Sequence, residues 1–336
     1  MKILILGGTK FFGREFAQER AKAGDSVTVF SRRCPAEDLP PSVTQIHGER
    51  GSLRELRELT HTYWDMVLDN LCFTPQDAEI AMSAFAGSVG LYVMVSTGDV
   101  HLTLLGAQSP YNEEMADRLP ENPEVRKNNS EPYGLGKRDA EKLLLRAHKA
   151  ADFPACIVRF PIVIGPRDSK VRAYSYWLRI SDGGPILLPD GGLYYRRFIY
   201  SGDTVRALSL LAQHPHLAAG EVFHFGDTVP VTLREWLELS ARLLEGKDNI
   251  VAVPAQWLSR HGFDMAGSPY FHPGNYVLGI EKAERMLGWV STPRHQWMAE
   301  TIRWYFENET PHPASYMSHR AQELELAKLW METKKQ

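Results

Sequence analysis

A glycine-rich turn at the start of the chain constrains its fold more than any other feature. Lys2–Leu6 is a short, branched, apolar run, which predicts a buried parallel strand. In Phe11–Ala23 the apolar residues recur at helical spacing. Between these two patterns lies Gly7–Gly13, with glycine at its first, second and last positions. A strand, a tight turn and a helix in this order predict the opening unit of an α/β sheet.

The same turn has the features of a pyrophosphate site. A helix N-terminus offers unpaired N–H groups and the positive end of a dipole to an anion. Gly7 permits the tight turn, Gly8 lets a ligand approach the backbone, and Gly13 lets the helix pack on the strand. An ordinary strand-to-helix turn is the alternative, and it would explain one glycine rather than three. We therefore predict dinucleotide contacts from Gly7, Gly8, Thr9, Lys10, Phe11, Phe12 and Gly13.

The residues after the second predicted strand, Ser26–Phe30, bear on the choice of cofactor. An acid here would bind the adenosine ribose and select NAD, but the chain continues Ser31, Arg32, Arg33. Lys10 and the two arginines could together bind a 2′-phosphate, which favours NADP(H). The alternative is that the arginines are solvated loop residues, and NAD(H) then remains possible.

A second motif, Tyr133-Gly-Leu-Gly-Lys137, predicts proton transfer. Two side chains at i and i+4 of a helix project from the same face, and a helix is predicted over Gly136–Ala151. A free tyrosine has a pKa of about 10, and a nearby ammonium together with the positive charge of an oxidised nicotinamide would lower that pKa. Thr97 ends another apolar strand pattern, Leu91–Val95, and could hydrogen-bond the substrate oxygen beside Tyr133. A surface pair of no consequence is the alternative for such a common spacing.

The order of patterns predicts a doubly wound parallel sheet of the Rossmann type in residues 1–165. Beyond residue 165, turns and aromatic residues become dense, which predicts a smaller α+β substrate lobe over 166–336, with possible returns to the sheet. The polar stretch Leu105–Ser130 is expected to form a loop over the active site. Further strands are expected at Thr44–His47, Met66–Asp69 and Ala155–Arg159.

Composition sets limits on the function. The 336 residues are long enough for a large core, and the net charge of −3 does not favour a polyanionic partner. Three scattered cysteines are too few for a disulfide framework or a zinc site. We therefore expect no metal site, and we expect the protein in the cytoplasm, where cysteines stay reduced. Neither a signal peptide nor a membrane-spanning run is expected.

Taken together, these motifs resemble the extended short-chain dehydrogenase/reductase family of NAD(P)-dependent epimerases, dehydratases and reductases. The resemblance covers nearly the whole chain and includes the two motifs above together with Val95–Val100, Val158–Pro166, Arg197–Thr204 and Lys282–Trp289. It implies that Thr97 and Tyr133 are catalytic, and that Lys137 tunes Tyr133 and holds the cofactor.

Further site residues follow from the resemblance. It implies that Glu49 lies near the adenine and Leu71 beside the dinucleotide. Dehydratases of the family that the chain resembles have Thr-Asp-Glu where this chain has Thr97-Gly98-Asp99, and their two acids drive the loss of water. One of these acids is absent here, so dehydration by that mechanism is not expected. His101 stands where tyrosine is common and is either a titratable group of the pocket or structural. The expected substrate contacts are Asp99, His101, Arg172, Tyr195 and Arg197.

Some second-half residues have two interpretations. Arg172, Tyr174, Tyr176 and Trp177 either line a substrate pocket or pack in the core, and Tyr195 and Arg197 either bind an anion or face solvent. The charged segment Ser315–Lys334 is either a docking helix for a homodimer or an amphipathic helix that closes the small lobe.

The leading hypothesis is an NAD(P)-dependent oxidoreductase or epimerase. It would move hydride at a secondary alcohol or carbonyl of a nucleotide sugar or small metabolite. The alternative is a non-catalytic or RNA-binding member of the same fold. The glycine turn with Lys10 resembles the turn of a branch of the family that includes chloroplast stem-loop RNA-binding proteins. The intact set of Thr97, Tyr133 and Lys137 and the negative net charge argue against RNA.

Overall fold

The chain divides into two compact units in a computed structural model that describes residues 1–308 and 310–334. The first unit consists of Met1–Val163, Ile199–Thr228 and Leu278–Ser291. The second contains Ile164–Phe198, Val229–Val277 and the residues from Thr292 onward. In the described part of the chain, no helix has both the length and the apolar character needed to cross a bilayer.

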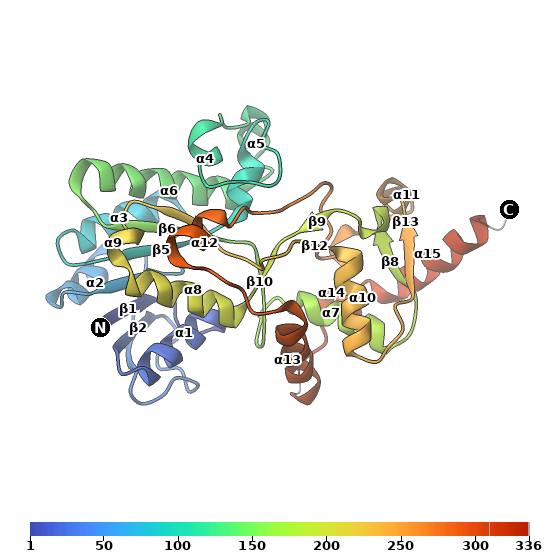
Figure 1. The fold of residues 1–336 in the computed structure, drawn as a ribbon, viewed down its shortest axis with the longest axis horizontal. Coiled ribbons are helices and arrows are strands. Elements are labelled where there is room, and N and C mark those ends of the chain that lie inside the picture. The colour runs from blue at the N-terminus through green and yellow to red at the C-terminus, as the bar shows by residue number, and fades with distance from the viewer. Residues whose placement is uncertain (309, 335–336) are drawn as a thin grey trace. The chain divides into compact units, whose positions relative to one another are not determined.

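A seven-stranded parallel sheet forms the centre of the first unit (Figure 1). The strand order is β11-β6-β5-β4-β1-β2-β3, so the direction of winding reverses between β1 and β4. Such a switch point opens a crevice at the carboxyl ends of the strands. This topology confirms the predicted Rossmann-type sheet. The strands are β1 (Lys2–Leu6), β2 (Ser26–Ser31), β3 (Thr44–His47), β4 (Met66–Asp69), β5 (Tyr92–Thr97), β6 (Ala155–Phe160) and β11 (Val222–His224).

Helices cover both faces of this sheet because successive strand residues point to opposite sides. Ile3 and Ile5 belong to the core under α1 (Phe11–Lys22) and α8 (Ser201–Gln213). Leu4 and Leu6 belong to the core on the other face. That face is covered by α2 (Leu53–Glu58), α3 (Pro75–Phe85) and α6 (Pro132–Ala151) (Figure 1).

The segment expected to be a loop, Leu105–Ser130, contains two short helices, α4 (Met115–Arg118) and α5 (Pro123–Asn128). The expectation of a plain loop was therefore wrong. Asn122 starts α5 by accepting a hydrogen bond from the backbone N–H of Glu124, and Pro123 has the fixed φ that suits a first helical turn. The other short elements of the first unit are η1 (Leu59–His61), η2 (Gly98–Thr103), α9 (Pro215–Ala218) and α12 (Glu281–Leu287).

The second unit is built on small sheets and an aromatic core. β8 (Ile186–Pro189) pairs in parallel with β13 (Ile250–Val253), and β9 (Tyr195–Arg196) pairs antiparallel with β12 (Val231–Thr232). The chain changes unit within β7 (Ile162–Ile164) and β10 (Phe198–Tyr200), which pair with each other. The helical elements are α7 (Arg172–Ser181), η3 (Asp190–Gly192), α10 (Leu233–Leu243), α11 (Ala255–Arg260), η4 (Met265–Gly267), α13 (Arg294–Glu307), α14 (Ala314–Met317) and α15 (Arg320–Thr333).

Aromatic side chains of α7 pack in this core. Tyr176 and Trp177 are at most 1% exposed; Trp177 stacks on Trp236 of α10, and Tyr176 packs against the same ring edge to face. Tyr174 is also buried and stacks on Tyr305. Of the two interpretations that the sequence left open for these three aromatic residues, the structure therefore favours packing.

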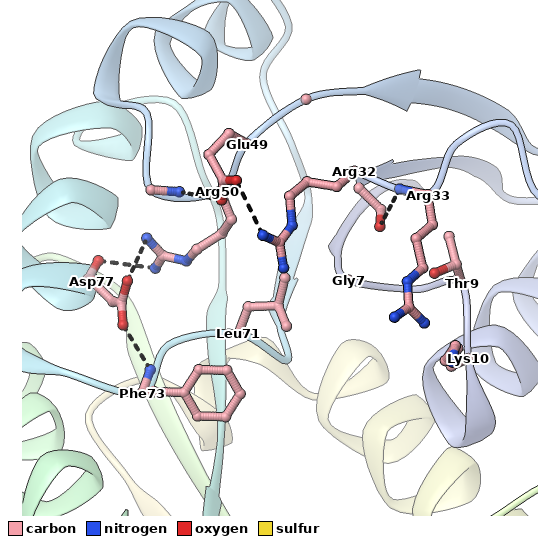
Figure 2. Close-up of a pocket in the computed structure, with 13 residues that line it drawn as sticks. Gly7, Thr9, Lys10, Arg32, Arg33, Glu49, Arg50, Leu71, Phe73 and Asp77 are labelled. Atoms are coloured by element: carbon pink, nitrogen blue, oxygen red, sulfur yellow. Dashed lines mark hydrogen bonds and ion pairs between the residues drawn. The ribbon is translucent and has the colours of Figure 1, made fainter. Parts of the chain in front are cut away.

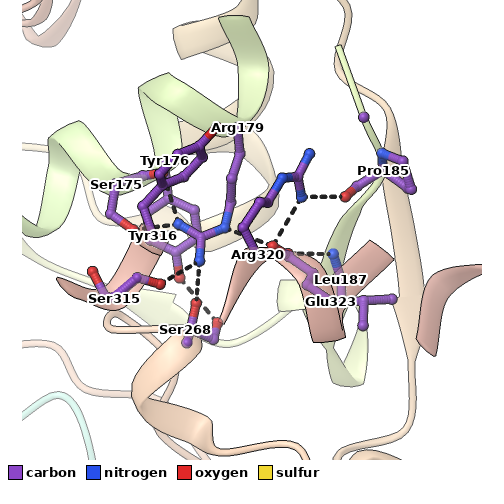
Figure 3. Close-up of polar contacts among 12 residues, drawn as sticks. Ser175, Tyr176, Arg179, Pro185, Leu187, Ser268, Ser315, Tyr316, Arg320 and Glu323 are labelled. Carbon is purple, nitrogen blue, oxygen red and sulfur yellow. Dashed lines mark hydrogen bonds and ion pairs between the residues drawn. The ribbon is translucent and has the colours of Figure 1, made fainter. Parts of the chain in front are cut away.

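A buried charge cluster holds the C-terminal helix α15 in the second unit (Figure 3). Arg179 of α7 has no exposed surface, and its Nε donates to the carboxylate of Glu323 at 2.8 Å. Arg320 donates to the same carboxylate at 2.9 Å, and the backbone N–H of Leu187 donates to its other oxygen at 3.0 Å. Leu326 packs in the same core as Leu187. The helix therefore closes the small lobe.

Glu323 should consequently be far more sensitive to substitution than a neighbour on the same helix. Glu323→Ala leaves the guanidinium of Arg179 buried without its carboxylate, which costs about 3–5 kcal/mol in comparable pairs. Glu325→Ala, at an exposed position, should change stability by less than about 0.5 kcal/mol. Urea unfolding of both variants measures the difference, and equal stabilities would show that the cluster does not anchor α15.

Candidate active site

A cavity of about 450 Å³ lies at the carboxyl ends of β1, β2 and β4 (Figure 2). It is in the first unit, on both sides of the strand switch point. Eight of the predicted cofactor residues line it: Gly7, Thr9, Lys10, Ser31, Arg32, Arg33, Glu49 and Leu71. The remaining ones, Gly8, Phe11, Phe12, Gly13 and Lys137, do not line this cavity.

The glycines of the turn are required for different reasons. Gly7 has a φ of +84°, and a Cβ there would lie 2.7 Å from Leu71 Cγ. A Cβ on Gly8 would lie 2.7 Å from Ile5 Cγ2, so Gly8 makes room for the sheet, and this space is not open to a ligand. A Cβ on Gly13 would come within 3.4 Å of the Gly7 oxygen, so Gly13 keeps the helix close to the strand as expected. Asn70 lies beside Gly13, and its side-chain amide is buried with no hydrogen-bond partner in the described residues.

Lys10, Arg32 and Arg33, the three cations that line the cavity beside the glycine turn and after β2, do not all lie together. Arg32 reaches across the cavity to Glu49, with 3.5 Å between Nη1 and Oε2 (Figure 2). Both side chains are more than half exposed, and an exposed pair contributes about 1 kcal/mol or less. Arg33 instead lies beside Thr9 and Lys10, on the side of the glycine turn (Figure 2). Arg33 and Lys10 are therefore the cations that share one part of the cavity.

Sequence reasoning missed a buried ion pair that supports the cavity wall. Asp69, at the end of β4, is fully buried and accepts hydrogen bonds from Arg50 Nη2 at 2.5 Å and from the Tyr92 hydroxyl at 2.6 Å. Its other oxygen accepts the backbone N–H of Leu71 at 2.8 Å. Burial alone would lower the pKa of Arg50, but the carboxylate of Asp69 raises it. The pair thus ties the turn that carries Glu49 to the turn that carries Leu71.

Thr97 and Tyr133 come together, as the sequence indicated. Thr97 lies close enough to Tyr133 to lower the pKa of its phenol, and Thr97 Oγ1 accepts the backbone N–H of Asp99 at 3.2 Å. Burial and the negative charge of Asp99 raise the pKa of Tyr133 to about 12, although Thr97 opposes this shift. About half of the Tyr133 side chain is nevertheless exposed, so a substrate can reach it.

The ammonium of Lys137 is bound by two backbone carbonyls. Its side chain is 1% exposed, and its ammonium donates to the carbonyls of Cys72 and Val95, both at 2.7 Å. It lies 4.4 Å from the centre of the Phe73 ring and 5.9 Å from that of Tyr133. Burial lowers the pKa of Lys137 to about 8. The expected lowering of the Tyr133 pKa by Lys137 together with an oxidised nicotinamide stays a prediction, because the structure contains no cofactor.

Two glycines on either side of Leu135 bring the loops to the catalytic helix. A Cβ on Gly134 would lie 2.6 Å from the Asp99 carbonyl oxygen, and one on Gly136 would lie 2.6 Å from that of Phe73. Any side chain would push these loops away from the first turn of α6. Each glycine inside a helix costs about 1 kcal/mol, so their presence was a signal that could have been read from the sequence.

A buried polar network lies behind Thr97. The hydroxyl of Ser96 donates to Glu141, which also accepts from Arg159 at 2.7 Å. Arg159 and His101 each lie 3.4 Å from Nε2 of His224. His101 is 1% exposed, and burial followed by the charge of Arg159 lowers its pKa to about 2. The structure places this predicted substrate contact in the core of the first unit.

The other predicted substrate residues, Arg172, Tyr195 and Arg197, belong to the second unit, and Tyr195 is 47% exposed. Their neighbour Arg196 is only 4% exposed. Its Nη2 donates to the His272 carbonyl at 2.5 Å, and no carboxylate pairs with it in residues 1–308 and 310–334. Burial lowers its pKa. A buried guanidinium without a carboxylate is suited to an anion.

We expect Tyr133 to stay protonated through neutral pH in the protein without cofactor, because its pKa is raised to about 12. The difference in phenolate absorbance between wild type and Tyr133→Phe during a pH titration measures this value. Asp99→Asn removes the neighbouring negative charge and should shift the Tyr133 ionisation to lower pH. Ionisation of Tyr133 at or below its ordinary value of about 10 would contradict this environment.

Comparison with solved structures shows the same fold over almost the whole chain. A dTDP-glucose 4,6-dehydratase from Bacillus anthracis, in complex with NAD, has a TM-score of 0.72 at 19% identity and covers 92% of this chain and 97% of its own. A UDP-glucose 4-epimerase from Thermotoga maritima, with UDP-glucose, has a TM-score of 0.71 at 18% identity and covers 91% and 99%.

Sequence relatives and a family model extend this comparison. A UDP-D-apiose/UDP-D-xylose synthase from Arabidopsis thaliana is 26% identical over 106 residues, which is 31% of this chain. The match spans only 27% of that relative's length. The model of the NAD dependent epimerase/dehydratase family matches residues 3–226, which include the glycine turn, Thr97, Tyr133 and Lys137. The chain therefore belongs to the NAD dependent epimerase/dehydratase family.

Proposed function

We propose that the protein is an NAD(P)-dependent oxidoreductase or epimerase that moves hydride at a secondary alcohol or carbonyl of a small molecule. The observation that carries this proposal is the half-exposed Tyr133 beside Thr97 at the end of β5, one helical turn from Lys137 on α6. All three residues lie in the same unit as the glycine-turn cavity. Family membership supports the proposal.

The cavity fits a dinucleotide in size and chemistry. Its volume of about 450 Å³ is in the range of cofactor sites, and it has cations at one side and apolar Leu71 and Phe73 at another. Gly7 and Gly13 give the close turn that a pyrophosphate site needs. When bound, the nicotinamide would accept or supply the hydride.

In this proposal the residues of the chain move only the proton. In the reducing direction, Tyr133 donates its phenolic proton to the carbonyl oxygen as hydride reaches the carbonyl carbon, which gives the alcohol. Oxidation reverses both transfers and requires Tyr133 as phenolate, the state that the neighbouring Thr97 favours. Lys137 positions Tyr133 through the first turn of α6. Because Gly98 replaces one acid, we propose redox or epimerase chemistry rather than dehydration.

For the cofactor, we propose a preference for NADP(H) over NAD(H). Arg33 and Lys10 share the side of the cavity next to the glycine turn, and neither has an acid as a recorded ion-pair partner in the described chain (Figure 2). Glu49 holds Arg32, but the exposure of this pair allows Arg32 to be released to a phosphate. NAD in similar structures, such as the Bacillus anthracis dehydratase, is the reason to test both cofactors.

For the substrate, we propose a nucleotide sugar, with a small metabolite carbonyl as the second class. UDP-glucose accompanies one similar structure, and a buried arginine without a carboxylate, Arg196, is available for an anionic group in the second unit. Asp99, Arg172, Tyr195 and Arg197 stay proposed contacts. A cytoplasmic location is part of the proposal and is supported by three buried free cysteines. We also propose that the protein forms a homodimer and that it does not bind nucleic acid.

Loss of the Tyr133 hydroxyl tests the proton-transfer role. With a panel of UDP- and dTDP-sugars and product detection by mass spectrometry, Tyr133→Phe should lower turnover by about 10²–10⁴-fold. Dinucleotide affinity should stay unchanged, because the hydroxyl is not part of the cavity wall. Tyr63→Phe, at an exposed position elsewhere in the first unit, is the matched control and should retain full activity. Normal turnover by Tyr133→Phe would reject the mechanism.

The cofactor preference has its own test. Wild type should bind NADPH more tightly than NADH, and Arg33→Gln should weaken NADPH binding by about tenfold while NADH binding is retained, because only the 2′-phosphate contact is lost. Arg57→Gln makes the same charge change at an exposed position of α2 and should alter neither affinity. Fluorescence titration measures all of these affinities. Tighter NADH binding by wild type would overturn the preference but leave the dinucleotide site intact.

A further inference from the structure

A second cavity, of about 400 Å³, lies against α6, the helix that carries Tyr133 and Lys137. It is formed by α6 and the segment 116–121, within the first unit. Four basic residues of α6 line it, and their spacing places them along one face of the helix: Arg138, Lys142, Arg146 and Lys149. The chain as a whole has a net charge of −3, so this positive cluster is a local feature.

The acids at this cavity do not neutralise the cluster. Only Asp117 and Glu121 line it together with the bases. Glu121 is held by Arg126, whose Nη2 donates at 2.7 Å, and by Arg138, whose Nη1 donates at 2.9 Å. In the described residues, no ion pair or hydrogen bond is recorded for the side chains of Lys142, Arg146 and Lys149. Burial and the charge of Arg138 lower the pKa of Lys142.

Arg138 gives a second, independent indication of a ligand. It is only 3% exposed, and its Nε has no hydrogen-bond partner in the part of the chain that the structure describes. Its Nη2 makes only long contacts, 3.5 and 3.4 Å, with the carbonyls of Ala116 and Leu119. A buried donor without an acceptor is costly, so the hydrogen bonds of Arg138 are incomplete in the protein without a ligand.

We propose that this basic cavity binds a small molecule through a phosphate or diphosphate group. Phosphate matches a forked guanidinium with several ammonium groups around it. The volume suits a small ligand, because such sites range over about 300–1,000 Å³. The carboxylates of Asp117 and Glu121 also line the cavity, and their negative charge disfavours a polyanionic chain such as RNA. The proposal does not depend on the reaction at Tyr133.

Binding here would also act on a segment next to the active site. Arg138 directly follows Lys137, and its contacts hold residues 116, 119 and 121, which lie in the insertion between Thr97 and Tyr133. An anion that joins Arg138 to the cations of α6 should therefore reduce the opening of residues 115–122. Hydrogen exchange of this segment reports on the site separately from the glycine turn.

The test uses inorganic pyrophosphate and the full-length chain. We expect saturable binding by calorimetry, and slower hydrogen exchange in 115–122 and in the second half of α6. Arg146→Gln/Lys149→Gln removes two exposed cations of the cavity and should weaken binding at least about tenfold, since two partly exposed pairs are lost. Arg242→Gln/Lys247→Gln makes the same charge change on the exposed surface of the second unit and should bind like wild type.

Several results would overturn the proposal. These are no binding at millimolar pyrophosphate, protection confined to the glycine turn, and equal weakening in the two double variants. Salt-sensitive binding of an oligonucleotide in the absence of pyrophosphate binding would also reject a small-ligand site in favour of a polyanion. Inorganic phosphate and a nucleoside diphosphate, titrated in parallel, distinguish a free anion from a phosphate carried by a larger molecule.

Discussion

The buried ammonium of Lys137 connects the parts of the candidate active site. It donates to carbonyls at the end of β5 and in the turn after β4, and it belongs to the helix that carries Tyr133. Gly134 and Gly136 let those two loops reach the helix. Without this cation, two backbone carbonyls would lose their donor in a region that water hardly reaches. Lys137 therefore has a structural role in addition to the functional one that we propose.

This arrangement changes the electrostatic picture of the phenol. The ammonium of Lys137 contacts backbone carbonyls and the Phe73 ring. Asp99, in contrast, lies near Tyr133, and its negative charge opposes ionisation of the phenol. A protonated Tyr133 is ready to donate a proton, and proton removal needs an additional positive charge. In the proposed function, that charge comes with the oxidised nicotinamide. In this proposal the chain supplies the phenol and its neighbours, and the cofactor supplies the positive charge that favours the phenolate.

Local patterns predicted the parts of the structure that depend on local forces. The strands Lys2–Leu6 and Met66–Asp69 were predicted with the bounds that the structure has, because buried parallel strands are short apolar runs ended by turns. The pairing of Arg50 with Asp69 could not be predicted, because it joins residues brought together only by the sheet order. The same is true of Arg159, Glu141 and His224. The burial of His101 and the sign of the Tyr133 pKa shift also depend on such long-range contacts.

The central claim is that the glycine-turn cavity binds a nicotinamide dinucleotide beside the Thr97–Tyr133 pair. Denaturing freshly purified protein and identifying the released small molecules by mass spectrometry tests it most directly. We predict NADP(H) or NAD(H), either retained from purification or taken up at one per chain when either is added before the protein is desalted. A protein that carries no dinucleotide and takes up neither would contradict the account.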